Sequence, residues 1–351
     1  MSFTIAAFWP PPPHETTTER YQEIADAGID LVITGNYLSD RTILKHALTC
    51  AHRTGLGMLV ASDPRVDVVM KDLDLPAEQT RELIGKVIDD YAGHPSFRGI
   101  SLMDEPYPER YERLAVGVAA VRDRGQLPYV NLFPSHATGE YDEYVGGFVD
   151  TVKPALVSFD RYPFLADGAY DEGYFGDLAV IREHATRAGV PAWLYIQTLA
   201  YEGHRTPNAA EIAWQVNTAL AYGYTGIQYF TYWTPDPSRG ESFEPALLHD
   251  GFRTDRYEVV KQLNNGWLRP VGNELSGLAW RSVRHTDAAV VGEYGDRHLL
   301  VCNASFETAS EVTVNGPVTA FDPATGSYQE SAPTFTLEPG AARLLLTGDG
   351  R

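Results

Sequence analysis

The sequence predicts an α/β protein: a (β/α)8 TIM barrel with a small C-terminal antiparallel β-domain. Between residues 3 and 278, eight short apolar runs alternate with longer amphipathic segments, the pattern of eight parallel strands that are each followed by a helix. After about residue 279 the pattern changes to short strands separated by turns, which is typical of an antiparallel sheet. A length of 351 residues suits one barrel and one small additional domain.

The expected barrel strands are apolar runs that end in polar or aromatic residues. They occupy residues 4–9, 31–36, 57–62, 100–103, 128–133, 156–160, 192–198 and 226–232. Amphipathic helices are expected at residues 18–27, 41–53, 77–91, 109–124, 141–152, 174–188, 209–222 and 257–268. Glycine, the usual residue just beyond a helix end, follows several of them: Gly28, Gly55, Gly125, Gly189 and Gly223.

A doubly wound sheet is the competing architecture. That fold binds nucleotides through a glycine-rich loop after the first strand, whereas residues 10–13 are four prolines, which lack the backbone N–H groups that hold a phosphate. The barrel is therefore predicted for residues 1–278 and the β-domain for residues 279–351. The strands expected in the β-domain lie at residues 288–294, 298–302, 311–314, 318–321 and 342–346.

Composition excludes several kinds of partner. A formal net charge of −19 argues against nucleic acid and against an anionic membrane surface, because both require a basic face. No run of eighteen apolar residues and no N-terminal signal pattern is present, so a cytoplasmic location is expected. Cys50 and Cys302 lie outside any close-spaced motif and are expected to be reduced. The scattered histidines indicate neither a metal site nor a cofactor, and oligomeric state is left open.

The fourth expected strand ends in two carboxylic acids. The run Gly-Ile-Ser-Leu-Met leads directly into Asp104, Glu105 and Pro106. Adjacent negative charges raise the free energy of a folded chain unless other groups use them. In a parallel barrel the C-terminal strand ends form the face where catalysis takes place. Asp104 and Glu105 are therefore predicted to be catalytic.

Other polar and aromatic residues are expected at the same face. Asp160 follows the sixth strand and is the third candidate catalytic residue. Amides and rings at this face suit a sugar, since amides hydrogen-bond hydroxyls and rings stack on apolar sugar faces, and a carboxyl pair can protonate the leaving oxygen and attack the sugar carbon. The predicted substrate-binding residues are Trp9, Asn36, Asp63, Asn131, Tyr162, Gln197, Tyr232 and Trp233.

The fourth-strand segment resembles the Asn-Glu-Pro signature that ends strand four in clan A glycoside hydrolases. The resemblance implies that Glu105 is the acid/base and that Asp104 replaces an asparagine that binds the sugar 2-hydroxyl. Residues 158–164 are similar to the Tyr-Pro segments of strand six in these enzymes. Residues 228–233 are similar to the strand-eight segment whose tryptophan forms the floor of the sugar site, and residues 250–264 are similar to the approach to the last helix.

Strand seven departs from this family. Clan A enzymes have a nucleophilic glutamate at the end of strand seven, where this chain has Gln197, and an amide cannot act as that nucleophile. Asp160 is the preferred partner, by resemblance to barrel glycosidases that pair acids from strands four and six. Glu105 is then the acid with Asp160 as base or nucleophile; alternatively, Asp104 is the nucleophile and Asp160 the acid/base. The structural alternatives are an ion pair of Asp160 with Arg161, a turn role for Asp63 and a buried amide at Gln197.

The sequence thus predicts a glycoside hydrolase that acts on oligosaccharides or glycosides, with exo-action as the expected mode. The missing strand-seven glutamate leaves one alternative, a carbohydrate-binding pseudoenzyme without turnover. A barrel isomerase, aldolase or lyase is disfavoured because no lysine, phosphate-binding glycine loop or metal-ligand set stands at the strand ends.

Overall fold

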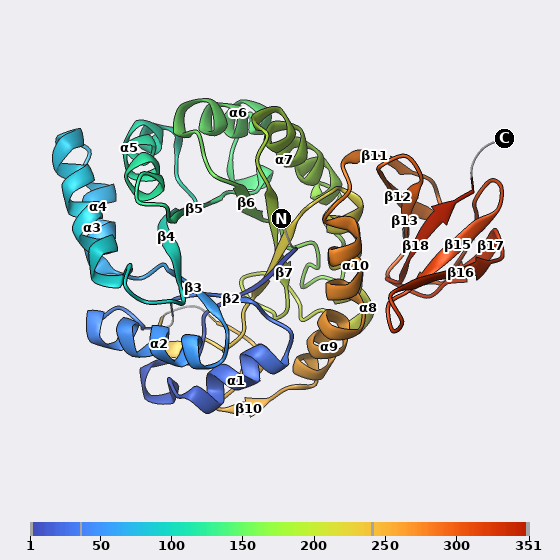
Figure 1. Ribbon diagram of the computed structural model, residues 1–351, viewed down its shortest axis with the longest axis horizontal. Helices are drawn as coiled ribbons and strands as arrows, with labels where there is room; N and C mark the ends of the chain where they lie inside the picture. The colour runs from blue at the N-terminus through green and yellow to red at the C-terminus, as the bar shows by residue number, and fades with distance from the viewer. Residues whose placement is uncertain (1–2, 36, 240–241, 349–351) are drawn as a thin grey trace.

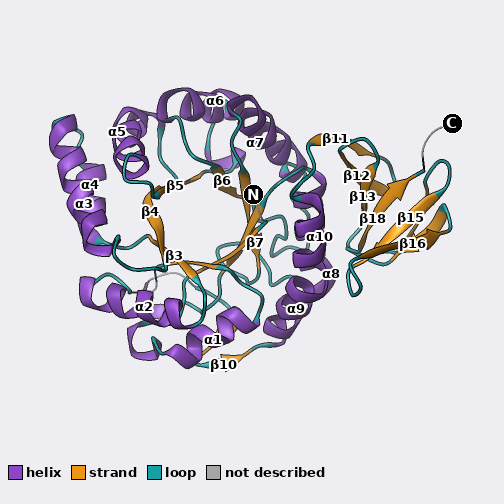
Figure 2. Cartoon of the chain, in the orientation of Figure 1, coloured by secondary structure: helices purple, strands orange, loops and turns teal. Residues whose placement is uncertain are grey.

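The structure is a computed structural model, and it describes residues 3–35, 37–239 and 242–348. Eight parallel strands close into a barrel, helices surround it, and a second, antiparallel unit lies beside the barrel (Figure 1). Figure 2 shows the strands as an inner ring and the helices as an outer ring. The predicted fold class, a TIM barrel with a small C-terminal β-domain, is confirmed.

Each of the eight expected runs contains a barrel strand. Strand β8 pairs with β1 in parallel, with Thr4 opposite Gly226, and this pairing closes the barrel. The strands are β1 (Thr4–Phe8), β2 (Leu31–Ile33), β3 (Gly57–Val60), β4 (Phe97–Asp104), β5 (Leu127–Leu132), β6 (Val157–Asp160), β7 (Ala192–Gln197) and β8 (Gly226–Phe230).

The helices cover the outer face of the barrel with their apolar sides. They are α1 (Thr18–Asp26), α2 (Arg41–Arg53), α3 (Pro64–Lys71), α4 (Ala77–Tyr91), α5 (Tyr111–Arg122), α6 (Tyr141–Val152), α7 (Tyr174–Ala188), α8 (Ala209–Ala221), α9 (Asp255–Leu263) and α10 (Arg269–Leu275). A five-residue π-helical segment, η5 (Asn264–Leu268), joins the last two. Short 3-10 turns are η1 (Pro13–Glu15), η2 (Pro108–Arg110), η3 (Ser135–Ala137) and η4 (Pro237–Arg239), and a small hairpin is formed by β9 (Leu248–His249) and β10 (Phe252–Arg253).

Large side chains fill the lower part of the barrel interior. Trp193 on β7 occupies the space next to Gly226 on β8, where an added Cβ would lie 2.5 Å from the indole Nε1. Leu31 and Leu156 belong to the same buried cluster. Glycine at position 226 is therefore what lets a tryptophan fit between two paired strands. The interior is a packed core at this level, and the polar strand ends lie above it.

The C-terminal domain is antiparallel. Its main sheet has the order β11-β12-β13-β18-β15-β16, and β14 pairs with β17 in a two-stranded sheet. The strands are β11 (Trp280–His285), β12 (Ala289–Tyr294), β13 (His298–Asn303), β14 (Ser310–Thr313), β15 (Val318–Asp322), β16 (Ser327–Ser331), β17 (Thr334–Leu337) and β18 (Ala342–Thr347). Strands β11, β16 and β17 were not predicted: β11 and β16 are mostly polar, and β17 is only four residues long.

The two domains contact each other closely along α8. Asn217 Nδ2 donates to the carbonyl of Gly340 at 2.8 Å, and Trp214 Nε1 donates to the carbonyl of Ala304 at 3.2 Å. Gly292 on β12 approaches the helix backbone so closely that an added Cβ would lie 2.4 Å from the Ala221 oxygen. Within the described ranges, no helix has the length and apolar character needed to cross a membrane.

Candidate active site

A cavity of about 890 Å³ opens at the C-terminal ends of the barrel strands. It lies within the size range of about 300–1,000 Å³ that is common for small-molecule sites. Asp104, Glu105 and Asp160, the three predicted catalytic residues, all line it. Trp9, Asn131 and Tyr162, which were predicted to bind substrate, line it as well.

A β-bulge in β4 sets the direction of Asp104. Ser101 lies opposite Tyr129 on β5, but the pairing shifts by one residue before Met103, so that Asp104 lies opposite Asn131. An extra residue in one strand reverses the alternation of side chains beyond it. Without the bulge, Asp104 would point toward the helices; with it, Asp104 shares the inward row of Asn131.

Glu105 leaves the strand in an uncommon backbone conformation. Its φ is +48°, in the left-handed region that only a few per cent of non-glycine residues adopt, and its N–H donates to the carbonyl of Asn131 at 2.8 Å. Trp9, also on the cavity wall, has a φ of +56°. Such strained residues are concentrated at functional sites, where the surrounding structure holds them in place.

A buried hydrogen-bond network supports Asp160. Asn131 Nδ2 donates to Asp160 Oδ1 at 2.7 Å, and Ser158 Oγ donates to Asn131 Oδ1 at 2.9 Å. Gln228 Nε2 donates to Ser158 Oγ at 2.8 Å, and the Tyr129 hydroxyl donates to Gln228 Oε1 at 2.5 Å. The network links β5, β6 and β8 beneath the cavity, so that the Asp160 carboxyl has a fixed orientation.

Asp160 has no ion pair with its neighbour in sequence, Arg161. The Arg161 guanidinium instead contacts Asp171 at 2.6 Å and Asp177 at 2.8 Å. The structural alternative for Asp160, an ion pair with Arg161, is therefore not what the structure shows. The Asp160 carboxyl therefore faces the cavity without an arginine partner.

The three carboxyls have raised pKa values. Solvent reaches the Asp104 side chain through the cavity mouth, but protein surrounds it elsewhere, and this burial raises its pKa to about 6. Burial and then the Asp104 charge raise the pKa of Glu105 to about 7. Burial and the charges of Glu105 and Asp104 raise the pKa of Asp160 well above its usual range, against the Asn131 hydrogen bond. Asp104 is therefore mostly ionised at pH 7, whereas Glu105 and Asp160 retain protons near neutral pH.

Aromatic rings form one wall of the cavity. Phe230 is central to it: its ring centroid lies 5.3 Å from those of both Tyr162 and Tyr201. Trp9 contacts Phe243 at 5.8 Å, edge to face. Eight aromatic residues of the described lining were not predicted to bind substrate: Phe8, Tyr37, Tyr129, Phe133, Tyr195, Tyr201, Phe230 and Phe243. Strand alternation could have identified Phe8, Tyr129 and Phe230, but Tyr201 and Phe243 come from loops, for which the sequence holds no positional signal.

The lining is acidic. Besides the three central carboxyls, Asp67 and Glu202 reach the cavity, together with His136 and His204. Burial lowers the pKa of His136, so this imidazole is neutral at neutral pH. Neither lysine nor arginine occurs among the described residues of the lining. No three His, Cys, Asp or Glu side chains in the described chain are grouped as metal ligands.

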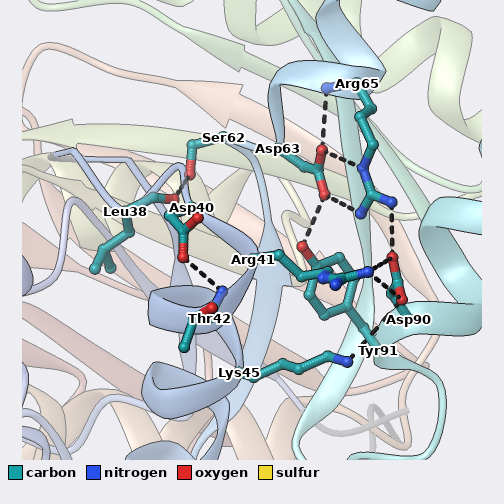
Figure 3. Close-up of polar contacts among 10 residues, drawn as sticks. All are labelled: Leu38, Asp40, Arg41, Thr42, Lys45, Ser62, Asp63, Arg65, Asp90 and Tyr91. Carbon is teal, nitrogen blue, oxygen red and sulfur yellow. Dashed lines mark hydrogen bonds and ion pairs between the residues drawn. The ribbon is translucent and has the colours of Figure 1, made fainter.

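Asp63 has a structural role and lies outside the described lining. It caps α3, and its carboxylate accepts hydrogen bonds from Arg65 Nη2 at 2.6 Å and from the Tyr91 hydroxyl at 2.7 Å (Figure 3). Arg65 continues to Asp90 at 2.6 Å. Both carboxylate oxygens of Asp63 are thus hydrogen-bonded to the scaffold, and its position does not support the predicted contact with substrate.

Gln197 is also part of the scaffold. It is fully buried; its Oε1 accepts from the Phe164 N–H at 3.1 Å, and its Nε2 donates to the carbonyls of Phe164 and Arg205 at 3.1 and 2.7 Å. These bonds join β7 to the loops that follow β6 and β7. Gln197 is absent from the described lining, so its position does not support the predicted contact with substrate.

The remaining predictions fall on strand eight and strand two. Tyr232 is fully buried and Trp233 is 6% exposed, and neither belongs to the described lining. The Trp233 ring instead lies under the Arg20 guanidinium, 5.6 Å from the ring centroid. Both side chains belong to the large buried cluster of the barrel and its helices. Asn36 lies outside the described residues.

Solved structures with this fold include several glycosidases. The chain superimposes on the β-galactosidase of the psychrophilic Marinomonas ef1 with a TM-score of 0.59 at 12% identity, covering 78% of this chain but only 60% of the galactosidase, less than two thirds of its length. A Bacteroides fragilis NCTC 9343 protein provisionally assigned as an α-galactosidase gives 0.59 at 12% identity, over 100% of this chain and 80% of that one. GH5_18 from Streptomyces cattleya, solved with GlcNAc, gives 0.52 at 15% identity, over 74% and 79%.

These likenesses establish a shared fold, the parallel eight-stranded barrel of glycoside hydrolases. Their identities are too low to carry residue roles from one chain to another. No protein-family profile matches the sequence, and no curated protein sequence does. The chemistry of this chain must therefore be argued from its own residues.

Proposed function

We propose that the protein is a glycoside hydrolase that cleaves O-glycosidic bonds by a two-carboxylate mechanism, with Glu105 as general acid/base. The supporting observation is the convergence of Asp104, Glu105 and Asp160 in one cavity that has an aromatic wall. Glycoside hydrolysis requires one protonated and one ionised carboxyl on either side of the scissile bond. Rings that stack on sugar faces supply the binding surface.

Charge and hydrogen bonding support these roles. The Glu105 charge raises the pKa of Asp160, so ionisation of Glu105 makes loss of a proton from Asp160 harder. Asn131 donates to Asp160 at 2.7 Å, whereas no described side chain donates a hydrogen bond to the Glu105 carboxyl. Since a donor stabilises the ionised form, this hydrogen bond favours Asp160 as the ionised partner and Glu105 as the proton carrier. Glu105 then protonates the leaving oxygen, and Asp160 acts as nucleophile or as the base that activates water.

A second role assignment has its own support. The pKa of Asp104 is about 6 and that of Glu105 is about 7, so Asp104 ionises before Glu105 as the pH rises. The strong burial of Asp160 favours its protonated form. In this assignment Asp104 is the nucleophile and Asp160 is the acid/base, with the same overall reaction.

The substrate class follows from the charge of the lining. Five carboxyl side chains and no described lysine or arginine line the cavity. A uronate, sulfated or phosphorylated sugar would meet only like charge there, and burying it would raise its free energy. The proposed substrate is therefore a neutral oligosaccharide or glycoside. Exo-action on a chain end is part of the proposal.

Two variants test the mechanism against substrates with different leaving groups. Glu105→Gln should lose about 10²–10⁴-fold in kcat on a natural disaccharide and far less on an aryl glycoside whose leaving group needs no proton. Asp160→Asn should lose activity on both substrates, because the attacking group is missing. Glu109→Gln, an exposed neighbour, is the matched control and should retain full activity.

The outcomes separate the alternatives. A loss that depends on the leaving group in Asp160→Asn, and not in Glu105→Gln, would reverse the roles and support Asp104 as nucleophile. Equal activity of wild type and Glu105→Gln on the disaccharide would contradict the proposed role of Glu105. Sugar binding by wild type without turnover on any substrate of a broad panel would show a carbohydrate-binding pseudoenzyme.

A further inference from the structure

A second pocket lies between the barrel and the β-domain, at the barrel end opposite the acidic cavity. It has a volume of about 170 Å³. Phe3 and Thr225 line it just before β1 and β8 begin, and Leu275 lines it from α10. Trp280 and Tyr294 line it from the β-domain. Figure 1 shows α7, α10 and β11 meeting at this junction.

The pocket contains an arginine without an acidic partner. Arg182 on α7 is half-buried and lines the pocket, and its guanidinium carbon lies 4.8 Å from the centroid of the Trp280 ring. Its Nε is buried and has no hydrogen-bond partner. No carboxylate of the described chain lies within 4.0 Å of the guanidinium. Tyr224 and Tyr294 are the titratable groups that act on the Arg182 charge. Burial raises the pKa of both hydroxyls, so both are neutral at pH 7.

Other arginines in buried positions of the described chain also have an unpartnered Nε, but their terminal nitrogens donate hydrogen bonds, unlike those of Arg182. Arg161 pairs with two aspartates, Asp171 and Asp177. Arg113 donates to Thr80 Oγ1 and to two backbone carbonyls. A guanidinium withdrawn from water is stable only when acceptors replace the water. Arg182 has the ring of Trp280 but lacks such acceptors, and this difference indicates an anion that is not part of the chain.

The two tyrosine hydroxyls and the indole N–H of the pocket walls already have partners. The Tyr224 hydroxyl donates to the Leu178 carbonyl at 3.0 Å, and the Trp280 indole donates to the Ala221 carbonyl at 2.9 Å. The Tyr294 hydroxyl donates to the Leu220 carbonyl. A molecule in the pocket therefore meets aromatic and aliphatic surface, and Arg182 supplies the hydrogen-bond donors that remain.

We propose that this junction pocket binds a small carboxylate with an apolar body, whose carboxylate pairs with Arg182 while its ring or short chain packs against Trp280, Tyr294 and Leu278. Arginine presents a planar fork of donors that matches a carboxylate in a bidentate manner. The volume of about 170 Å³ equals that of roughly six water molecules at about 30 Å³ each, which limits the ligand to about ten non-hydrogen atoms.

The proposed site is independent of the proposed hydrolase activity. It lies at the opposite end of the barrel and shares no residue with the acidic cavity. Because its walls come from both domains, a bound ligand would stabilise their contact and raise the melting temperature by mass action. The net charge of the chain is −19, so the unpaired guanidinium of Arg182 is a local positive charge that attracts an anion.

Fluorine NMR titration of the full-length protein tests the proposal, with para-fluorobenzoate as probe and para-fluorobenzamide as its uncharged counterpart. The benzoate should bind with a Kd of about 10 mM or tighter, a value set by ligand size. Arg182→Gln should weaken this binding at least tenfold, since a charge-assisted hydrogen bond is lost. Arg187→Gln is the matched control, because Arg187 lies on the same helix but is exposed and pairs with Asp150.

A second variant guards against a folding defect in Arg182→Gln. Ser276 lines the pocket and is exposed, so Ser276→Phe should narrow the pocket without unfolding the protein, and it too should weaken benzoate binding at least tenfold. Circular dichroism checks the fold of each variant. Three results would each overturn the proposal: no binding of the benzoate by wild type up to about 10 mM, equal binding of the benzamide, or wild-type affinity in folded Arg182→Gln or Ser276→Phe.

Discussion

Asp160 and Gln197 end neighbouring barrel strands, yet their side chains lie in different surroundings. Asp160 on β6 accepts one side-chain hydrogen bond, from Asn131, and its carboxyl faces the cavity. The side-chain amide of Gln197 on β7 forms hydrogen bonds with the backbone of Phe164 and Arg205, and the residue lies outside the described lining. The position at a strand end does not by itself decide whether a polar side chain faces the cavity. The decisive factor is whether backbone groups of nearby loops form hydrogen bonds with that side chain.

The largest effect expected from this comparison is a loss of activity at alkaline pH. The general acid must be protonated, and the pKa of Glu105 is raised to about 7, so kcat should fall about tenfold for each pH unit above about pH 8. Asp104→Asn removes a charge that raises this pKa and should therefore move the alkaline limb to lower pH. Rate profiles of both proteins measure the shift.

The same profiles can contradict the assignment. Asp67→Asn is the matched control, since Asp67 lines the cavity but pairs with Lys71, and its profile should coincide with that of wild type. An unmoved alkaline limb in Asp104→Asn would contradict the electrostatic coupling. Complete inactivity of Asp104→Asn at every pH would instead identify Asp104 as the nucleophile.

The next effect concerns stability. Gln197→Glu introduces the residue type that clan A enzymes carry at this position, but here it should destabilise the fold by about 3 kcal/mol. The carboxylate would face the carbonyl oxygens of Phe164 and Arg205, which now accept hydrogen bonds from the Gln197 amide. Urea unfolding measures the change. Unchanged stability, or a gain in hydrolytic rate, would show that position 197 belongs to the site and would break the comparison with Asp160.

The smallest effect is expected at Asp63. Asp63→Asn should lower the free energy of unfolding by about 1 kcal/mol at pH 7 and leave kcat unchanged. Burial raises the pKa of Asp63, but hydrogen bonds from Arg65 and Tyr91 outweigh this and lower it overall. The stabilisation is therefore present above the ordinary pKa of 3.8 and is lost as pH falls through the lower folded value.

Urea unfolding at pH 7 and under acidic conditions checks this dependence. The difference between wild type and Asp63→Asn should close as the medium becomes more acidic, because both proteins then carry a neutral side chain at this position. A variant with wild-type stability but impaired substrate binding would return Asp63 to the site.

The strand-four acids and Asp160 were predictable because strand order alone brings the C-terminal ends of parallel strands together. The direction of Asp104 was not, since it depends on a one-residue bulge in β4 that no sequence pattern marks. Helix α3 was missed because Asp63 and Pro64 read as a turn, although aspartate and proline also begin helices. The aromatic wall could be predicted only in part, because Tyr201 and Phe243 lie in loops, whose course depends on tertiary contacts.

The packed lower barrel has a consequence for the traffic of molecules through the site. With Trp193 wedged against Gly226 and leucines around it, the interior offers no exit at the far end. A ligand that enters the acidic cavity must leave through the same opening, so a departing product delays the entry of the next substrate. The Trp193 indole fits because residue 226 is glycine, and together with its neighbours it closes the barrel interior at the far end.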